Sequence, residues 1–173
     1  MDLKAILKMA AVTMAAALMM AVPVGAKAQA GDTVLKPTDM EKLLPEKVYY
    51  KGQSATTQLR NSGGVMFADG TYLLTTLVDT SGYSTGIQAK YQAYFITEEP
   101  IKVGGQKLAA GIYGIGFVDG DKLLVTDVGA HEVLTVSTGT DAGLARPRPL
   151  QVVADGTHGY RIYAGRRYVT IAR

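Results

Sequence analysis

The feature that most constrains the fold is a regular alternation between short β-forming runs and turn-forming glycine and aspartate. From Val48 onward, valine, isoleucine, threonine and tyrosine gather in such runs, without helical patterns between them. Asp-Gly occurs three times between runs, at residues 69–70, 119–120 and 155–156. Both central positions of a type I′ turn need positive φ, which aspartate tolerates and glycine accepts, so each pair predicts a hairpin. The sequence therefore predicts an all-β fold, an antiparallel β-sandwich or closed β-barrel of about eight to eleven strands.

One run is ambiguous, because residues 88–97 fit both the two-residue period of a strand and the spacing of a helix. We predict a strand there, since the alternation is unbroken from Ala89 to Phe95 and the segment ends at Pro100 without a helix cap. A short hairpin is expected around Gly104-Gly105. The other candidate strands are residues 48–51, 55–60, 65–68, 71–78, 112–118, 122–128, 132–137, 150–154, 160–164 and 168–172.

A short N-terminal helix is the exception to the β pattern. Thr38 and Glu41 have the spacing of a capping box, and Pro45 stops the turn, which predicts a helix over residues 38–44. The polar residues 31–37 before it are expected to be a flexible leader. Residues 38–173 are long enough for one domain with a core and too short for two, so we predict a single β domain.

The first thirty residues have the pattern of a secretory signal peptide. Lys4 and Lys8 precede an uncharged apolar run over residues 9–22, and small-x-small cleavage sequences follow at residues 26–30. As a helix this run would span about 21 Å, which is short of the roughly 30 Å hydrocarbon core of a membrane. We therefore expect residues 1–30 to be removed and the mature chain to be soluble in the periplasm or the extracellular space.

The mature chain divides into a mildly acidic body and a basic C-terminal segment. Residues 142–173 hold six arginines and one acidic residue, in an Arg/Pro loop (142–149) and a basic C-terminal hairpin (150–173). Guanidinium groups beside aromatic rings suit anionic ligands, and charge on a terminal hairpin also protects an edge strand from pairing with another chain. If a ligand surface exists, its candidate residues are Arg161, Arg166, Arg167, Tyr160, Tyr163 and Tyr168.

Residue types for catalysis or metal binding are scarce. The chain has no cysteine, which excludes disulfides, thiolate metal sites and cysteine nucleophiles. Residues 82–86 match the G-x-S-x-G elbow around Ser84, but we expect a strand to follow, and the elbow needs a helix there. His131 and His158 are expected in surface turns. We therefore predict no catalytic residue, no metal site and no cofactor, with a serine hydrolase at Ser84 as a minor alternative.

Two further patterns concern internal similarity and glycine placement. Residues 67–76 and 117–126 share the pattern F-x-D-G-x-x-L-L-x-T, which fits either a duplicated half or two hairpins that converged on similar turns. Gly114 and Gly116 lie on one face of a predicted strand. We expect aromatic side chains from a neighbouring strand to fill that face; a ligand slot is the alternative.

Part of the chain resembles known bacterial sequences. Residues 63–70 with 77–83 resemble a group of small uncharacterised exported bacterial proteins, seen notably among acidobacteria. Residues 103–105 with 108–113 are similar to the L-x-A-G-x-Y hairpin of secreted β-sandwich domains of unknown function. The resemblance implies export and an all-β fold, and it transfers no catalytic residue.

Taken together, these patterns predict an exported, non-enzymatic β-domain protein that acts as a binding module. The expected partner is an anionic polymer of the cell envelope or another envelope protein, with no specific nucleic acid. A structural subunit that assembles through an edge strand fits the composition nearly as well.

Overall fold

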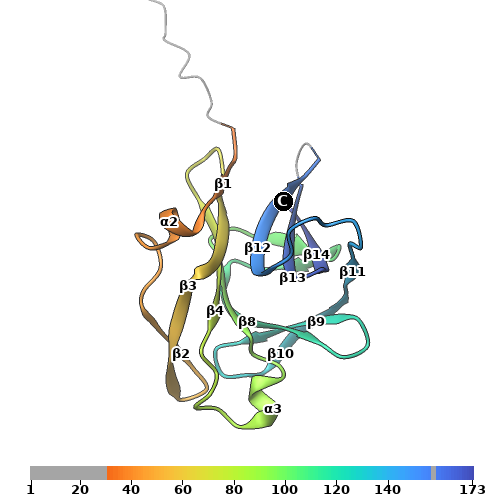
Figure 1. The fold of residues 1–173 in the computed structure, drawn as a ribbon. Helices are drawn as coiled ribbons and strands as arrows, with labels where there is room; N and C mark the ends of the chain where they lie inside the picture. The colour runs from red at the N-terminus through yellow and green to blue at the C-terminus, as the bar shows by residue number, and fades with distance from the viewer. Residues whose placement is uncertain (1–30, 157–158) are drawn as a thin grey trace, which may run out of the picture. The chain divides into compact units, whose positions relative to one another are not determined.

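The computed structural model describes residues 31–156 and 159–173, so the predicted signal peptide and His158 lie outside the described residues. Two antiparallel sheets pack face to face around a shared core, which confirms the predicted all-β sandwich (Figure 1). No helix in the described part of the chain is long and apolar enough to cross a membrane.

The first sheet has the order β1-β3-β4-β5-β8-β9-β10, with β2 also paired to β3. Its strands are β1 (Thr33–Leu35), β2 (Lys47–Tyr50), β3 (Gln53–Met66), β4 (Tyr72–Val78), β5 (Ala93–Thr97), β8 (Gly111–Val118), β9 (Lys122–Asp127) and β10 (Glu132–Ser137). The second sheet has the order β12-β13-β14-β6-β7, with β11 paired to β14. Its strands are β6 (Ile101–Val103), β7 (Gln106–Leu108), β11 (Gly139–Thr140), β12 (Arg148–Asp155), β13 (Gly159–Gly165) and β14 (Arg167–Ala172).

Fourteen strands exceed the predicted eight to eleven because four of them, β1, β6, β7 and β11, have only two or three residues. The runs predicted at residues 55–60 and 65–68 form the single strand β3, which continues through an irregularity between Gln58 and Ser62. Most other strands lie within one or two residues of the predicted runs, because their apolar periodicity matches their burial.

All three Asp-Gly pairs connect strands that are antiparallel neighbours, as predicted, but the turn geometry differs from the prediction. Positive φ occurs at Gly70, Gly120 and Gly156, whereas the preceding aspartates do not adopt it. Both central positions have positive φ instead at Lys51-Gly52 and at Gly104-Gly105, in two-residue hairpin loops. The hairpin expected at Gly104-Gly105 is thus confirmed.

The main core lies between the sheets and consists of inward-facing aliphatic and aromatic side chains. The largest fully buried members are Phe67, Phe95, Leu73, Ile115, Leu123, Ile162 and Ile171. At about 1.5–3 kcal/mol for each buried side chain of this size, this layer is the main stabilising feature of a domain without cysteine.

A second cluster covers the outer face of the first sheet. The ring of Tyr91 stacks on that of Tyr50 at 3.7 Å, and the Tyr83 ring meets both edge-on. A Cβ on Gly114 would come within 2.7 Å of the Tyr50 and Tyr91 rings, and one on Gly116 would meet the backbone of Lys90. Aromatic side chains therefore fill the glycine face at Gly114, as expected.

Two predicted segments are corrected. The leader at residues 31–37 is in part strand β1, whose residues pair with Gly64, Val65 and Met66 of β3. The strand predicted over residues 88–97 was wrong in its first half, where α3 (Thr85–Gln88) precedes the shorter β5. The helical spacing of Ile87 and Tyr91 prevails because it places both side chains on the tyrosine cluster.

The N-terminal helix α2 (Pro37–Met40) is shorter than predicted and continues only as turns to residue 43. Its cap differs as well, because the Lys36 amide donates to the Asp39 carboxylate at 2.9 Å. Thr38 and Glu41 are not the capping pair. The helix buries Met40 completely, together with Leu44, against Leu74 of β4.

The repeated hairpins share burial but not register. Leu73 and Leu123 are both buried in the main core. Leu73 pairs with Val65, whereas Leu123 pairs with Phe117, so the turns are offset by one residue relative to the sequence match. This difference favours two similar hairpins over a symmetric duplication.

Candidate functional site

The six candidate ligand residues lie on the hairpin of β13 and β14, but they do not share one surface. Arg161 and Tyr163 alternate with Tyr160 along β13, and Tyr163 pairs with Tyr168 of β14. Tyr160 faces the main core, where its ring meets Phe67 edge-on at 6.2 Å. The structure therefore groups Arg161, Tyr163 and Tyr168 on the opposite face.

Arg161 is held by its own hairpin. Its Nε donates to Asp155 Oδ2 at 2.9 Å, and its guanidinium lies 4.3 Å from the centre of the Tyr168 ring. A hydrogen bond to the Tyr163 hydroxyl and the contact with Asp155 raise the pKa of Arg161 above its usual value. Tyr163 is buried and donates to Asp141 Oδ2 at 3.1 Å. This cluster links β12, β13 and the residues after β11.

Arg166 and Arg167 each hold backbone carbonyls of another segment. Arg166 Nη1 donates to the carbonyls of Ala142 and Leu144, both at 2.7 Å, and so fastens the Arg/Pro loop to the turn between β13 and β14. Arg167 Nη2 donates to the Val118 carbonyl at 2.6 Å, and its guanidinium lies 5.6 Å from the Phe117 ring centre. Arg167 therefore joins the second sheet to the β8–β9 hairpin of the first.

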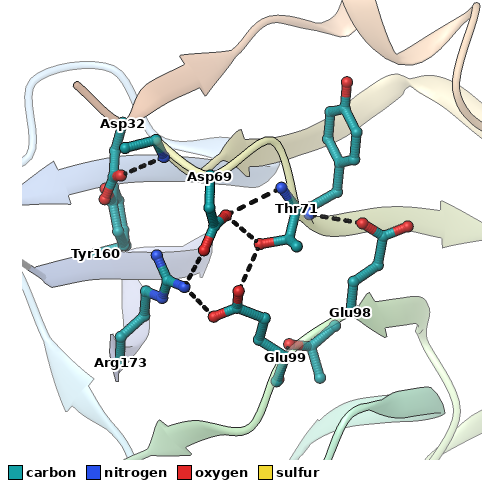
Figure 2. A network of polar contacts seen from close by, with 10 residues as sticks. Asp32, Asp69, Thr71, Glu98, Glu99, Tyr160 and Arg173 are labelled. Atoms are coloured by element: carbon teal, nitrogen blue, oxygen red, sulfur yellow. Dashed lines mark hydrogen bonds and ion pairs between the residues drawn. The ribbon is translucent and has the colours of Figure 1, made fainter. Parts of the chain in front are cut away.

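A second polar network lies where the end of β14 approaches the turn between β3 and β4 (Figure 2). Arg173 contacts Asp69 Oδ2 at 2.5 Å and also Glu99, and it lies 4.5 Å from the centre of the Phe67 ring. Hydrogen bonds from Thr71, followed by those from Arg173, hold the pKa of Asp69 well below its usual value. This network connects the second sheet to the first through one guanidinium.

Tyr160 contributes to the same end of the sandwich. Its hydroxyl donates to Asp32 Oδ2 at 2.6 Å, while Asp32 Oδ1 accepts from the Ala68 amide at 2.9 Å (Figure 2). Burial, followed by the hydrogen bond to Asp32, raises the pKa of Tyr160 above its usual value. Asp32, Tyr160 and Arg173 line a cavity of about 780 Å³. Its polar groups are already paired with one another or with backbone.

Sequence reasoning did not find Asp32, Asp69 or Glu99 as partners of the C-terminal residues. Asp69 was visible as part of a turn, and Glu99 was assigned to a solvated loop. Nothing in the local pattern indicates that Arg173 contacts both, because 104 and 74 residues separate them along the chain.

Two C-terminal arginines differ from the other four. Arg146 and Arg148 are exposed, and no carboxylate of residues 31–156 or 159–173 lies within ion-pair distance of either. Arg148 begins β12 opposite Gly165, beside the turn that carries Arg166. The exposed cations of the segment therefore lie at the Arg/Pro loop rather than on the face of the hairpin.

The elbow motif takes a different shape from the one expected. Ser84 precedes α3, so a helical turn follows it, which corrects the predicted strand. The residue lines a cavity of about 370 Å³ with Lys51, Lys90 and Thr126. Ser84 lies in an antiparallel setting, without the parallel sheet on which the elbow is normally presented.

His131 is exposed, and its Nδ1 lies 2.9 Å from Asp127 Oδ2. Asp127 also accepts from the His131 and Gly129 amides, and these contacts lower its pKa, the His131 amide most strongly. This arrangement closes the turn between β9 and β10. In the described ranges, no group of three or more histidine or carboxylate side chains could hold a metal ion.

Comparisons of the chain with known protein families, with curated proteins and with solved structures find no match.

Proposed function

We propose that the protein is an exported, non-enzymatic β module that binds an anionic polymer of the cell envelope, in the periplasm or outside the cell. The leader sequence of residues 1–30 supports export, and so does the resemblance to small exported bacterial proteins. Mass analysis of protein purified from an exporting host tests this part. A chain that begins near residue 29 or 31 is expected, and retention of residues 1–28 would contradict it.

The observation that carries the binding proposal is the contrast among the C-terminal arginines. Arg161, Arg167 and Arg173 pair with carboxylates or carbonyls of the domain itself. Arg146 and Arg148 lie exposed on a proline-flanked segment, where each proline restricts the backbone and keeps the two cations extended. An extended pair of guanidinium groups matches successive anionic groups along a polymer.

Binding of a defined polyanion tests this assignment. The protein is titrated with dextran sulfate, and neutral dextran serves as the ligand control. We expect affinity to fall steeply from low to high salt, because the screening length shortens from about 10 Å at 0.1 M to about 3 Å at 1 M. Arg146→Gln with Arg148→Gln should weaken binding about thirtyfold, at about 1 kcal/mol for each charge at contact distance.

A matched control removes the same charge elsewhere. Lys42 and Lys47 are exposed on the side of the molecule formed by α2 and β2, so Lys42→Gln with Lys47→Gln should leave binding nearly unchanged. Equal loss in both double variants would mean that net charge alone drives binding. Salt-insensitive binding would instead support assembly through an edge strand, for which β10 offers the half-exposed Val133.

The hydrolase alternative is tested separately. A fluorophosphonate probe that labels the protein, with labelling abolished by Ser84→Ala, would replace the binding proposal by an enzymatic one. We expect no labelling.

A further inference from the structure

A groove beside the β6–β7 hairpin has a chemistry that the polymer proposal does not use. It has a volume of about 400 Å³ and is bounded by Pro100, Ile101, Leu108 and Ala109. Lys102 and Lys107 also line it. The groove thus combines a mainly apolar surface with two ammonium groups.

The two lysines are placed directly against each other. Lys102 of β6 pairs with Lys107 of β7 in the antiparallel register, and both side chains are exposed. Like charges in directly opposed positions destabilise a strand pair unless an anion lies between them. Among residues 31–156 and 159–173, no carboxylate lies within ion-pair distance of either lysine.

The nearest acidic groups along the sheet are already engaged. Glu99 and Asp69 contact Arg173, which also borders the groove. Asp155 lies in the same cross-strand row as Lys102 but three strands away, a distance of about 14 Å at the usual strand spacing, and it pairs with Arg161. An external anion would therefore meet both lysines without a competing internal partner.

We propose that this groove binds an anionic amphiphile of the fatty-acid type. The carboxylate lies between Lys102 and Lys107, and the acyl chain packs along Pro100 and Ala109. Charge complementarity selects the head group, because two ammonium groups at one end of an apolar groove match a single anion joined to a hydrocarbon chain. Arg173 contributes little, since Asp69 and Glu99 occupy its guanidinium.

This site is separate from the polymer surface. Lys102 pairs with Ala172 at one end of β14, whereas Arg148 lies opposite Gly165, beside the start of β14 at Arg167. The length of the strand separates these ends by about 17 Å. Failure of the polymer proposal would therefore leave this one standing, and the reverse also holds.

Calorimetric titration with dodecanoate below its micellar concentration tests the groove, using protein purified from the full-length gene. We expect saturable binding with one site per chain. Acetate and phosphate, which lack the chain, and dodecyl maltoside, which lacks the charge, should bind at least tenfold more weakly.

Variants locate the site. Lys102→Gln with Lys107→Gln should weaken dodecanoate binding about tenfold, whereas Lys42→Gln with Lys47→Gln should not change it. Ala109→Asp places an anion in the exposed part of the groove and should abolish binding without unfolding the protein, which circular dichroism verifies.

Either of two results would overturn the proposal. The first is dodecanoate binding that is absent or equal in all variants. The second is self-association of the Lys102→Gln/Lys107→Gln variant with no change in ligand binding, which would mean that the lysines serve only to protect the strand edge.

Discussion

The buried hydroxyl of Tyr91 allows a direct test of the side-chain packing described above. Tyr91 is fully buried, and its ring stacks on Tyr50 at 3.7 Å. Within the described residues, its hydroxyl has no hydrogen-bond partner. An unpaired buried polar group costs about 1–3 kcal/mol, so Tyr91→Phe, which keeps the ring, should raise the free energy of unfolding by about 1 kcal/mol.

Tyr50 provides the matched control in the same stack. Its hydroxyl lies 2.7 Å from Thr126 Oγ1, in a buried hydrogen bond. Tyr50→Phe removes the same atom from the neighbouring ring but breaks this bond, so the free energy of unfolding should fall by about 1–2 kcal/mol. The two variants should therefore change stability in opposite directions.

Urea unfolding at neutral pH, followed by far-ultraviolet circular dichroism, measures both changes. A gain of 1 kcal/mol should also raise the melting temperature by about 3–5 °C in a domain of this size. If Tyr91→Phe destabilises the protein as much as Tyr50→Phe does, the Tyr91 hydroxyl has a partner in solution. The reasoning from an unpaired group would then be wrong.

Three further predictions concern pH and packing. Burial raises the pKa of Tyr91 above 10, so its stabilising contribution is complete below pH 10 and is lost at higher pH; Tyr91→Phe should flatten this alkaline decline in thermal unfolding. Gly114→Ala puts a Cβ 2.7 Å from the Tyr50 ring, and it should lower the free energy of unfolding by about 1–3 kcal/mol in urea titrations. The lowered pKa of Asp69 means that its contribution is complete above pH 3.8 and is lost as pH falls further; Asp69→Asn should therefore weaken acid-range stability less than stability at pH 7, as acid titration will show.

The local β pattern predicts much of the sandwich from the sequence. Hairpins at Asp119-Gly120 and Gly104-Gly105 follow from turn residues between apolar runs, and both are present. These features depend on neighbouring residues alone. For this reason periodicity and turn chemistry find them without knowledge of the tertiary contacts.

The errors come from contacts between distant segments. Tyr91 lies between Tyr50 and Tyr83, and this packing favours α3 over the strand that alternation predicted. Strand β1 is too short to have a period and exists because Val34 pairs with Val65. Tertiary contacts override local propensity at both places.

The candidate site was less predictable than the fold for the same reason. The basic segment and its arginines were visible, but their partners were not. Arg167 donates to carbonyls of Val118 and Lys122, and backbone groups leave no signature in the sequence. Composition therefore identified the cations without showing which of them face outward.

The most direct test compares two pairs of arginines in the same protein by thermal unfolding and by dextran sulfate binding. Arg161→Gln with Arg167→Gln should lower the melting temperature by several degrees, since it breaks bonds between segments. At temperatures where that variant is folded, it should bind nearly as well as the wild type. Arg146→Gln with Arg148→Gln should leave the melting temperature unchanged and weaken binding about thirtyfold. The reverse pattern, with binding lost at Arg161 and Arg167 and kept without Arg146 and Arg148, would contradict the division of the arginines into structural and ligand-binding groups.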